Sequence, residues 1–226
     1  KTPYHTILID TCLGKDKGYG PPHDFSKQPW LDGFKRNGLR FEDIDYVFCT
    51  HLHIDHCGWN TRLIDGRWVP TFPNAKYIFS KREYETWEAE TKKGFNPPGN
   101  VWLQNCQPIM EAEQAILVDD DFQLDDIVWI TSTPGHSPGH VCINLKSGHQ
   151  RAIFSGDVMH HALQCIEPDW SSCFCWDAHQ SALTRRKLLA SVADTDTLVM
   201  PAHFPSPTAG RVISKGEAYQ FNFIKD

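Results

Sequence analysis

Short apolar runs alternate along the chain with longer amphipathic stretches. The apolar runs predict seven strands, and the amphipathic stretches predict three helices. The strands are expected at Thr6–Asp10, Tyr46–Thr50, Lys76–Ser80, Ile127–Thr131, His140–Leu145, Ala152–Ser155 and Leu198–Met200, and the helices at Pro29–Asn37, Lys81–Thr91 and Ser181–Ala193. This alternation is typical of an α/β layered fold.

Four of the predicted strands are followed closely by an imidazole or a carboxylate. These side chains are His51, His136, Asp157 and His203. Ligands gather at the carboxyl ends of strands in α/β sheets, so we expect these four residues to converge.

The densest group of polar side chains is the run His51-Leu52-His53-Ile54-Asp55-His56, directly after a predicted strand. Neutral imidazoles and a carboxylate suit zinc, with bonds of roughly 2.0–2.2 Å. Gly58 is expected to let the backbone turn tightly beneath the cluster. Histidines in a polar surface loop are the alternative, but the spacing and the three later residues at strand ends favour a metal site.

This run, followed by His136, Asp157 and His203, resembles the HxHxDH…H…D…H signature of the metallo-β-lactamase-fold hydrolases. The loop from Thr133 to His140 resembles that of the lactonase-like branch, which includes the acyl-homoserine-lactone lactonases. The resemblance implies an α/β fold built as a four-layer αββα sandwich. It also implies strands upstream of Thr6–Asp10, so we expect the chain, which opens with Lys1, to lack its first strands.

The same resemblance implies a centre of two divalent metal ions, with zinc the favoured identity. His51, His53 and His136 would hold the first ion, and Asp55, His56 and His203 the second, with Asp157 between both. The expected enzyme is a metal-dependent hydrolase of the EC 3 class in which a metal-bridging hydroxide attacks an ester or lactone, either an acyl-homoserine lactone or an arylester. Asp55 and Asp157 are the expected catalytic residues. Phosphotriester hydrolysis and an iron-dependent oxidoreductase of the same fold are the alternatives.

Three further residues lie near these ligands in the sequence. His140 is expected to be a structural histidine that opens the next strand, although a contact to a metal ligand is the alternative. His160 is expected to line the substrate pocket, with packing at the edge of the site as the alternative. Cys57 is expected to be a buried, inert thiol. Aromatic side chains are mostly expected in the core, and some are available to line an apolar pocket.

The bulk composition limits the remaining classes. A chain of 226 residues suits a single domain over residues 1–226. A formal net charge of −6 argues against a nucleic-acid partner, and no apolar run approaches the roughly 20 residues of a membrane span, so we expect a small-molecule substrate. Eight scattered cysteines favour reduced thiols and a cytoplasmic location. The sequence leaves open whether the protein forms a homo-oligomer.

Overall fold

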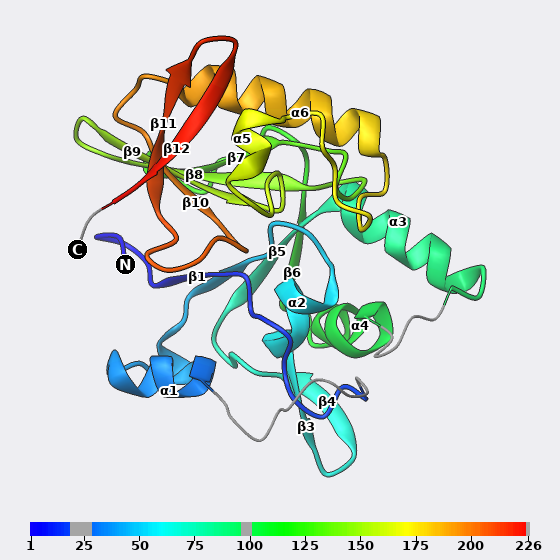
Figure 1. Ribbon diagram of the computed structural model, residues 1–226. Helices are drawn as coiled ribbons and strands as arrows, with labels where there is room; N and C mark the ends of the chain where they lie inside the picture. The colour runs from blue at the N-terminus through cyan, green and yellow to red at the C-terminus, as the bar shows by residue number, and fades with distance from the viewer. Residues whose placement is uncertain (19–28, 96–100, 225–226) are drawn as a thin grey trace. The chain divides into compact units, whose positions relative to one another are not determined.

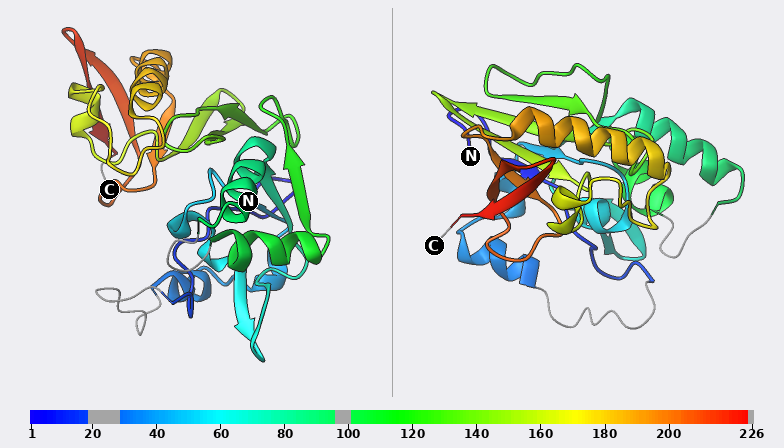
Figure 2. Two further views of the ribbon diagram at one scale, coloured as in Figure 1. Left: turned by 90° about the vertical axis from the view of Figure 1, so that its right-hand side faces the viewer. Right: turned by 45° about the horizontal axis from the view of Figure 1, so that its top comes forward.

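A computed structural model describes residues 1–18, 29–95 and 101–224. The chain forms two compact units, Lys1–Val118 and Asp119–Asp226. Figures 1 and 2 show the elements of both units. The single domain over residues 1–226 stays a prediction.

The first unit contains a four-stranded parallel sheet in the order β1-β2-β5-β6. A separate antiparallel hairpin, β3–β4, lies outside this sheet. The strands are β1 Ile7–Ile9, β2 Tyr46–Phe48, β3 Thr61–Ile64, β4 Arg67–Pro70, β5 Lys76–Ser80 and β6 Ala115–Val118. The helices are α1 Pro29–Arg36, α2 Ile54–Cys57, α3 Lys81–Lys92 and α4 Gln107–Glu111, with 3₁₀ turns at Phe41–Asp43 and Gly58–Asn60 and a π-helical segment at Trp102–Cys106.

The core of the first unit joins this sheet to its helices. Val47, Tyr77 and Phe79 from the strands are almost fully buried and belong to one apolar cluster with Tyr84 of α3 and Ile109 of α4. Helix α3 begins where predicted because the Oγ of Ser80 accepts a hydrogen bond from the backbone N–H of Glu83 at 3.4 Å.

The second unit contains a six-stranded mixed sheet in the order β12-β11-β10-β9-β8-β7. Only β9 and β10 pair in parallel; the other neighbours are antiparallel. The strands are β7 Val128–Ser132, β8 Val141–Ser147, β9 Gln150–Gly156, β10 Leu198–Pro201, β11 Gly210–Lys215 and β12 Ala218–Phe223. The helices are α5 Leu163–Ile166 and α6 Ala178–Val192.

Helix α6 packs against this second sheet. Its buried Leu189 and Val192 share an apolar cluster with Val199 of β10 and Val212 of β11, and Figure 1 shows the helix beside these strands. The helix begins three residues before the predicted start at Ser181, because the carboxylate of Asp177 accepts a hydrogen bond from the N–H of Gln180 at 2.9 Å.

The seven predicted strands and three predicted helices all correspond to observed elements, with ends that differ by up to three residues. Within the described part of the chain, no helix is both long enough and apolar enough to cross a membrane. The eight cysteines are free thiols, as the composition predicts.

Candidate metal centre

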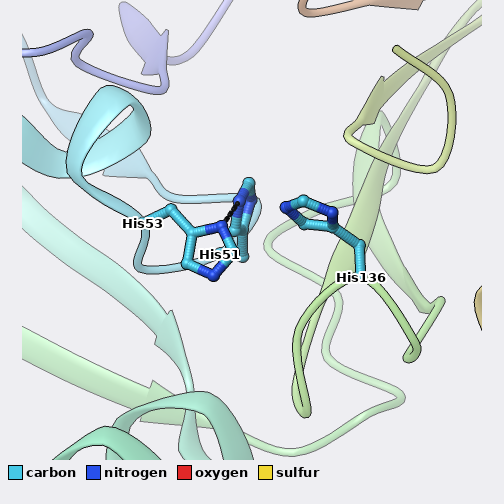
Figure 3. Close-up of side chains that lie close together, drawn as sticks. All are labelled: His51, His53 and His136. Atoms are coloured by element: carbon cyan, nitrogen blue, oxygen red, sulfur yellow. Dashed lines mark hydrogen bonds between the residues drawn. The ribbon is translucent and has the colours of Figure 1, made fainter. Parts of the chain in front are cut away.

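The first unit presents four potential ligands on the turn after β2. We call His51, His53, Asp55 and His56 the first ligand cluster. His53 directly precedes α2, while Asp55 and His56 lie within it, so a strand end and one short helix position the whole group. His51 and His56 are buried, and His53 and Asp55 are half-buried. The Nε2 of His51 lies 3.0 Å from the Nδ1 of His53, as the dashed line in Figure 3 shows.

Asp10, which directly follows β1, fixes two imidazoles of this cluster. Its carboxylate lies 2.8 Å from the Nδ1 of His56 and accepts hydrogen bonds from the N–H and the hydroxyl of Thr50, each at 2.8 Å. A carboxylate only accepts, so the Nδ1 of His56 carries the proton and its Nε2 presents a lone pair. Since the Thr50 hydroxyl donates to Asp10, its oxygen accepts from the Nδ1 of His51 at 3.1 Å, which leaves the Nε2 of His51 with a lone pair as well.

Glu83 of α3 supports the backbone of the first ligand cluster. Its side chain is fully buried, and its Oε1 accepts hydrogen bonds from the N–H of Leu52 at 3.1 Å and from the indole N–H of Trp87 at 2.7 Å. The Trp87 ring in turn lies edge-on against the ring of His53, with centroids 5.5 Å apart. Helix α3 therefore holds the turn that carries the first two histidines.

Cys57 and Gly58 complete this turn. The thiol of Cys57 is buried and donates to the carbonyl of His53 at 3.1 Å, and burial raises its pKa well above the ordinary value, as expected for an inert thiol. Gly58 begins the 3₁₀ turn Gly58–Asn60, and its φ of −61° is open to any residue, so the backbone conformation of this turn does not itself require glycine. Glycine is required there for space: a Cβ would lie 2.0 Å from the carbonyl carbon of Leu13.

The second unit presents four further potential ligands. We call His136, Asp157, His160 and His203 the second ligand cluster. Asp157 directly follows β9, His203 follows β10 by two residues, and His136 lies on the loop after β7; Figure 3 also draws His136. The Oδ2 of Asp157 lies 3.3 Å from the Nε2 of His136, 3.2 Å from that of His160 and 3.0 Å from that of His203.

The donor set of the second ligand cluster fits a divalent cation. Three imidazole nitrogens surround one carboxylate oxygen, and the ligand atoms of His136, Asp157 and His160 all lie within 4.8 Å of one another. Imidazole nitrogen and carboxylate oxygen are ligands that zinc takes in proteins. His160, predicted to line a pocket, thus lies against Asp157, with its ring stacked on that of His203 at 5.3 Å.

His140 holds the backbone of Asp157. Its ring is fully buried, and its Nε2 accepts a hydrogen bond from the N–H of Asp157 at 3.0 Å. The Nδ1 therefore carries the proton and donates to the hydroxyl of Thr133 at 2.8 Å. His140 precedes β8 as predicted, and it also performs the alternative role of supporting a candidate ligand.

The structure thus groups His51, His53, Asp55 and His56 in one unit and His136, Asp157, His160 and His203 in the other. Two supporting residues were not predicted from the sequence: Asp10 and Glu83. Asp10 carried a usable signal, because it ends the predicted strand Thr6–Asp10 just as other polar residues follow the remaining strands. Glu83 lies inside helix α3 and gave no such signal.

Comparison with curated proteins identifies lactonases and metallo-hydrolases among the relatives. N-acyl homoserine lactonase AttM of Rhizobium radiobacter is 32% identical over 194 residues, which are 80% of this chain and 66% of AttM. The probable metallo-hydrolase YflN of Bacillus subtilis (strain 168) is 26% identical over 162 residues, 70% of this chain and 56% of YflN. The chain therefore spans less than two thirds of the length of either relative.

Solved structures of similar fold cover almost the whole chain. The hydrolase AbOPH, described as a member of the beta-lactamase superfamily, superposes with a TM-score of 0.82 and 25% identity over 99% of this chain and 78% of its own. AidC, described as a dizinc quorum-quenching lactonase, gives a TM-score of 0.79 and 26% identity over 100% of this chain and 78% of its own. These matches confirm the predicted fold class.

The family assignment rests on a match along most of the sequence. Residues 4–203 match the model of the metallo-beta-lactamase superfamily, and this range contains both ligand clusters. The chain belongs to the metallo-beta-lactamase superfamily.

Proposed function

We propose that this protein is a metal-dependent hydrolase that opens lactones or cleaves esters with two divalent metal ions, zinc being the favoured identity. The observation that carries the proposal is the convergence of three imidazole nitrogens on one oxygen of Asp157, each within 3.3 Å. Relatives named as N-acyl homoserine lactonases support the substrate class, and an acyl-homoserine lactone or an arylester is the first choice.

The ligand assignment follows the motif of the family. His51, His53 and His136 hold one ion, Asp55, His56 and His203 hold the other, and Asp157 is shared. Divalent ions held there supply Lewis acidity that lowers the pKa of water to about 7 and polarises the substrate carbonyl.

The side chains of the protein prepare this chemistry in two ways. Asp10 keeps the Nε2 of His51 and the Nε2 of His56 unprotonated, which is the form that binds a cation. Asp55, whose Oδ2 lies 3.6 Å from the Nε2 of His56, receives a proton from the attacking water at this oxygen. As the new bond from water oxygen to the acyl carbon forms and the acyl C–O bond breaks, Asp55 passes this proton to the leaving oxygen.

His160 is the residue we assign to the substrate. Its side chain is half-buried, and its Nε2 lies 3.2 Å from Asp157. It is therefore close enough to the ligands to donate a hydrogen bond to the carbonyl oxygen as negative charge develops there.

Metal analysis and a substrate panel test this function together. The purified protein, loaded with zinc and freed of excess metal, should contain two zinc ions per chain and hydrolyse members of a panel of acyl-homoserine lactones, aryl esters and a dialkyl aryl phosphate. His136→Ala should lower both the metal content and the activity. His149→Ala, which changes an exposed histidine between β8 and β9, is the matched control and should lower neither.

The outcomes separate the alternatives. Turnover of the phosphate alone would favour a phosphotriester hydrolase, and activity that depends on iron would favour the oxidoreductase. Full activity after metal removal would contradict the proposal.

A further inference from the structure

Arg185 of α6 is a fully buried arginine whose hydrogen bonds lead to the second ligand cluster. Its Nε donates to the carbonyl of Val158 at 2.8 Å, and its Nη2 donates to the hydroxyl of Ser181 at 3.0 Å. Its Nη1 donates to the carbonyls of Pro168 and Trp170. These acceptors are all neutral. Burying a guanidinium group against neutral acceptors is costly, which points to a role for Arg185 beyond filling space.

One branch of these hydrogen bonds reaches Asp157. Val158, whose carbonyl accepts from Arg185, is the next residue in the chain. On the other side, the N–H of Asp157 donates to His140. His140 thus holds the N–H of Asp157, the backbone N–H of Val158 donates to the carbonyl of Ser155 at 3.2 Å, and Arg185 holds the carbonyl of Val158. The backbone on both sides of Asp157 is therefore fixed, and this restricts the direction of its carboxylate.

The other branch reaches His136. The Ser181 hydroxyl, which accepts from Arg185, lies 3.4 Å from the Sγ of Cys175, and this sulfur lies 3.7 Å from the Nδ1 of His136. The thiol of Cys175 donates to Ser181, so its sulfur accepts from the Nδ1–H of His136. The Nε2 of His136, which lies toward Asp157, then presents its lone pair.

Backbone contacts reinforce this second branch. The N–H groups of Trp176 and Asp177 donate to the carbonyls of His136 and Gly135, each at 2.9 Å. Gly135 has a φ of +134°, and a Cβ there would lie 2.3 Å from the backbone nitrogen of Ser181. The loop that carries His136 therefore packs directly on the first turn of α6, where Ser181 lies.

We propose that Arg185 is a positioning residue that holds the loops of His136 and Asp157 in the geometry that binds metal. This inference rests on the proposed metal-dependent function. Arg185 touches neither ligand side chain, and it acts through Val158 on one loop and through Ser181 and Cys175 on the other.

The test compares Arg185→Lys with Arg186→Lys. Lysine keeps the positive charge but replaces the planar guanidinium group with a single ammonium group, which cannot reach the four acceptors of Arg185 at the same time. We expect Arg185→Lys to lower zinc affinity, measured by competition with a chromophoric chelator, by about 10- to 100-fold. Arg186 is exposed and pairs with Asp169 on the surface, so Arg186→Lys should leave zinc affinity unchanged.

Cobalt substitution separates a positioning role from a purely structural one. The visible absorption bands of bound Co²⁺ report the geometry of its ligands, and we expect them to shift in Arg185→Lys and also in Ser181→Ala and Cys175→Ala. If Arg185 only supports the fold, the metal-free variant will melt at a lower temperature while the zinc affinity and the cobalt spectrum stay as in the wild type. That result would overturn the proposal.

Three further outcomes have defined meanings. If Arg185→Lys does not fold, unchanged zinc affinity and unchanged cobalt spectra in both Ser181→Ala and Cys175→Ala overturn the proposal. A wild-type protein that binds no zinc contradicts the proposed function itself, and the positioning role fails with it. Normal zinc binding in the wild type with no effect of the variants contradicts the positioning role alone.

Discussion

Asp10 and His56 are 46 residues apart in the sequence, and a 2.8 Å hydrogen bond joins the Asp10 carboxylate to the Nδ1 of His56. The same carboxylate accepts from Thr50, whose hydroxyl oxygen accepts from the Nδ1 of His51. One acidic side chain thus sets the protonated nitrogen of two candidate ligands. This arrangement orients the rings and makes the remaining nitrogens more basic.

Asp10→Asn should therefore weaken metal binding without removing any ligand. The amide keeps one oxygen acceptor but replaces the other with an N–H₂ group, which cannot accept from either partner. We expect zinc affinity to fall by about 10- to 100-fold, measured by chelator competition. Asp43→Asn, which breaks a surface ion pair with Arg40, is the control and should have no effect on affinity. Equal affinities in Asp10→Asn and the wild type would show that Asp10 does not tune the site.

The strands of the fold could be predicted where a local apolar run has clear borders. The strand Lys76–Ser80 was predicted with its observed ends, because its apolar residues stop at the helix cap Ser80. Strand β2 ends at Phe48, before the predicted Thr50, since the N–H of Thr50 bonds to Asp10 and not to a neighbouring strand. The two strands of the hairpin β11–β12 were not predicted. Their apolar residues alternate with polar ones and so form no continuous apolar run, and their pairing depends on the rest of the sheet.

The candidate ligands could be predicted for a related reason. They are metal-binding residue types placed at strand ends, and both features are visible in a short window of sequence. The supporting residues are defined by distant contacts: Glu83 bonds to the backbone 31 residues away at Leu52, and Arg185 bonds 27 residues away at Val158. A helical glutamate or arginine usually faces solvent, so sequence alone favours the wrong environment for both.

Gly58→Ala should destabilise the first unit through a steric clash. The added Cβ would meet the backbone of Leu13 and Cys12 at distances of 2.0 to 2.5 Å, and backbone atoms cannot move aside as a flexible side chain can. We expect a loss of about 1–3 kcal/mol or more in the free energy of unfolding, measured by urea denaturation. In Gly33→Ala in α1 the new methyl group meets only the end of the Arg36 side chain, at an ordinary contact distance of 3.9 Å, so this control should be neutral or slightly stabilising. A neutral Gly58→Ala would mean that the segment at Leu13 shifts freely.

His160→Phe should separate substrate contact from metal binding. Phenylalanine preserves a ring that can stack on His203 but removes both nitrogens. If His160 donates to the developing oxyanion, the variant keeps two zinc ions and loses about 100-fold in kcat on a lactone substrate. His149→Phe changes an exposed histidine and should retain full activity. Loss of a zinc ion from His160→Phe would instead make His160 a metal ligand.

Lys17 is a buried lysine in the first unit. Its ammonium donates to the hydroxyl of Thr61 at 2.6 Å and lies 3.7 Å from the centre of the Trp68 ring. Burial lowers the pKa of Lys17 to about 7, although the nearby thiols of Cys57 and Cys106 oppose the shift. The charged form is therefore disfavoured in the folded protein relative to the unfolded chain, where the lysine pKa is about 10.4.

Lys17→Met should consequently stabilise the protein more at pH 6.5 than at pH 9.5. Between about pH 7 and pH 10.4 the unfolded chain binds a proton at Lys17 that the folded protein does not, so the wild type gains stability as the pH rises. The advantage of the variant is greatest below pH 7 and shrinks by up to about 1.4 kcal/mol per pH unit above it. Urea denaturation of both proteins at the two pH values measures this difference, and the exposed Lys15→Met should show none. An advantage that grows with pH would mean that Lys17 stays charged in the fold, held by Thr61 and Trp68.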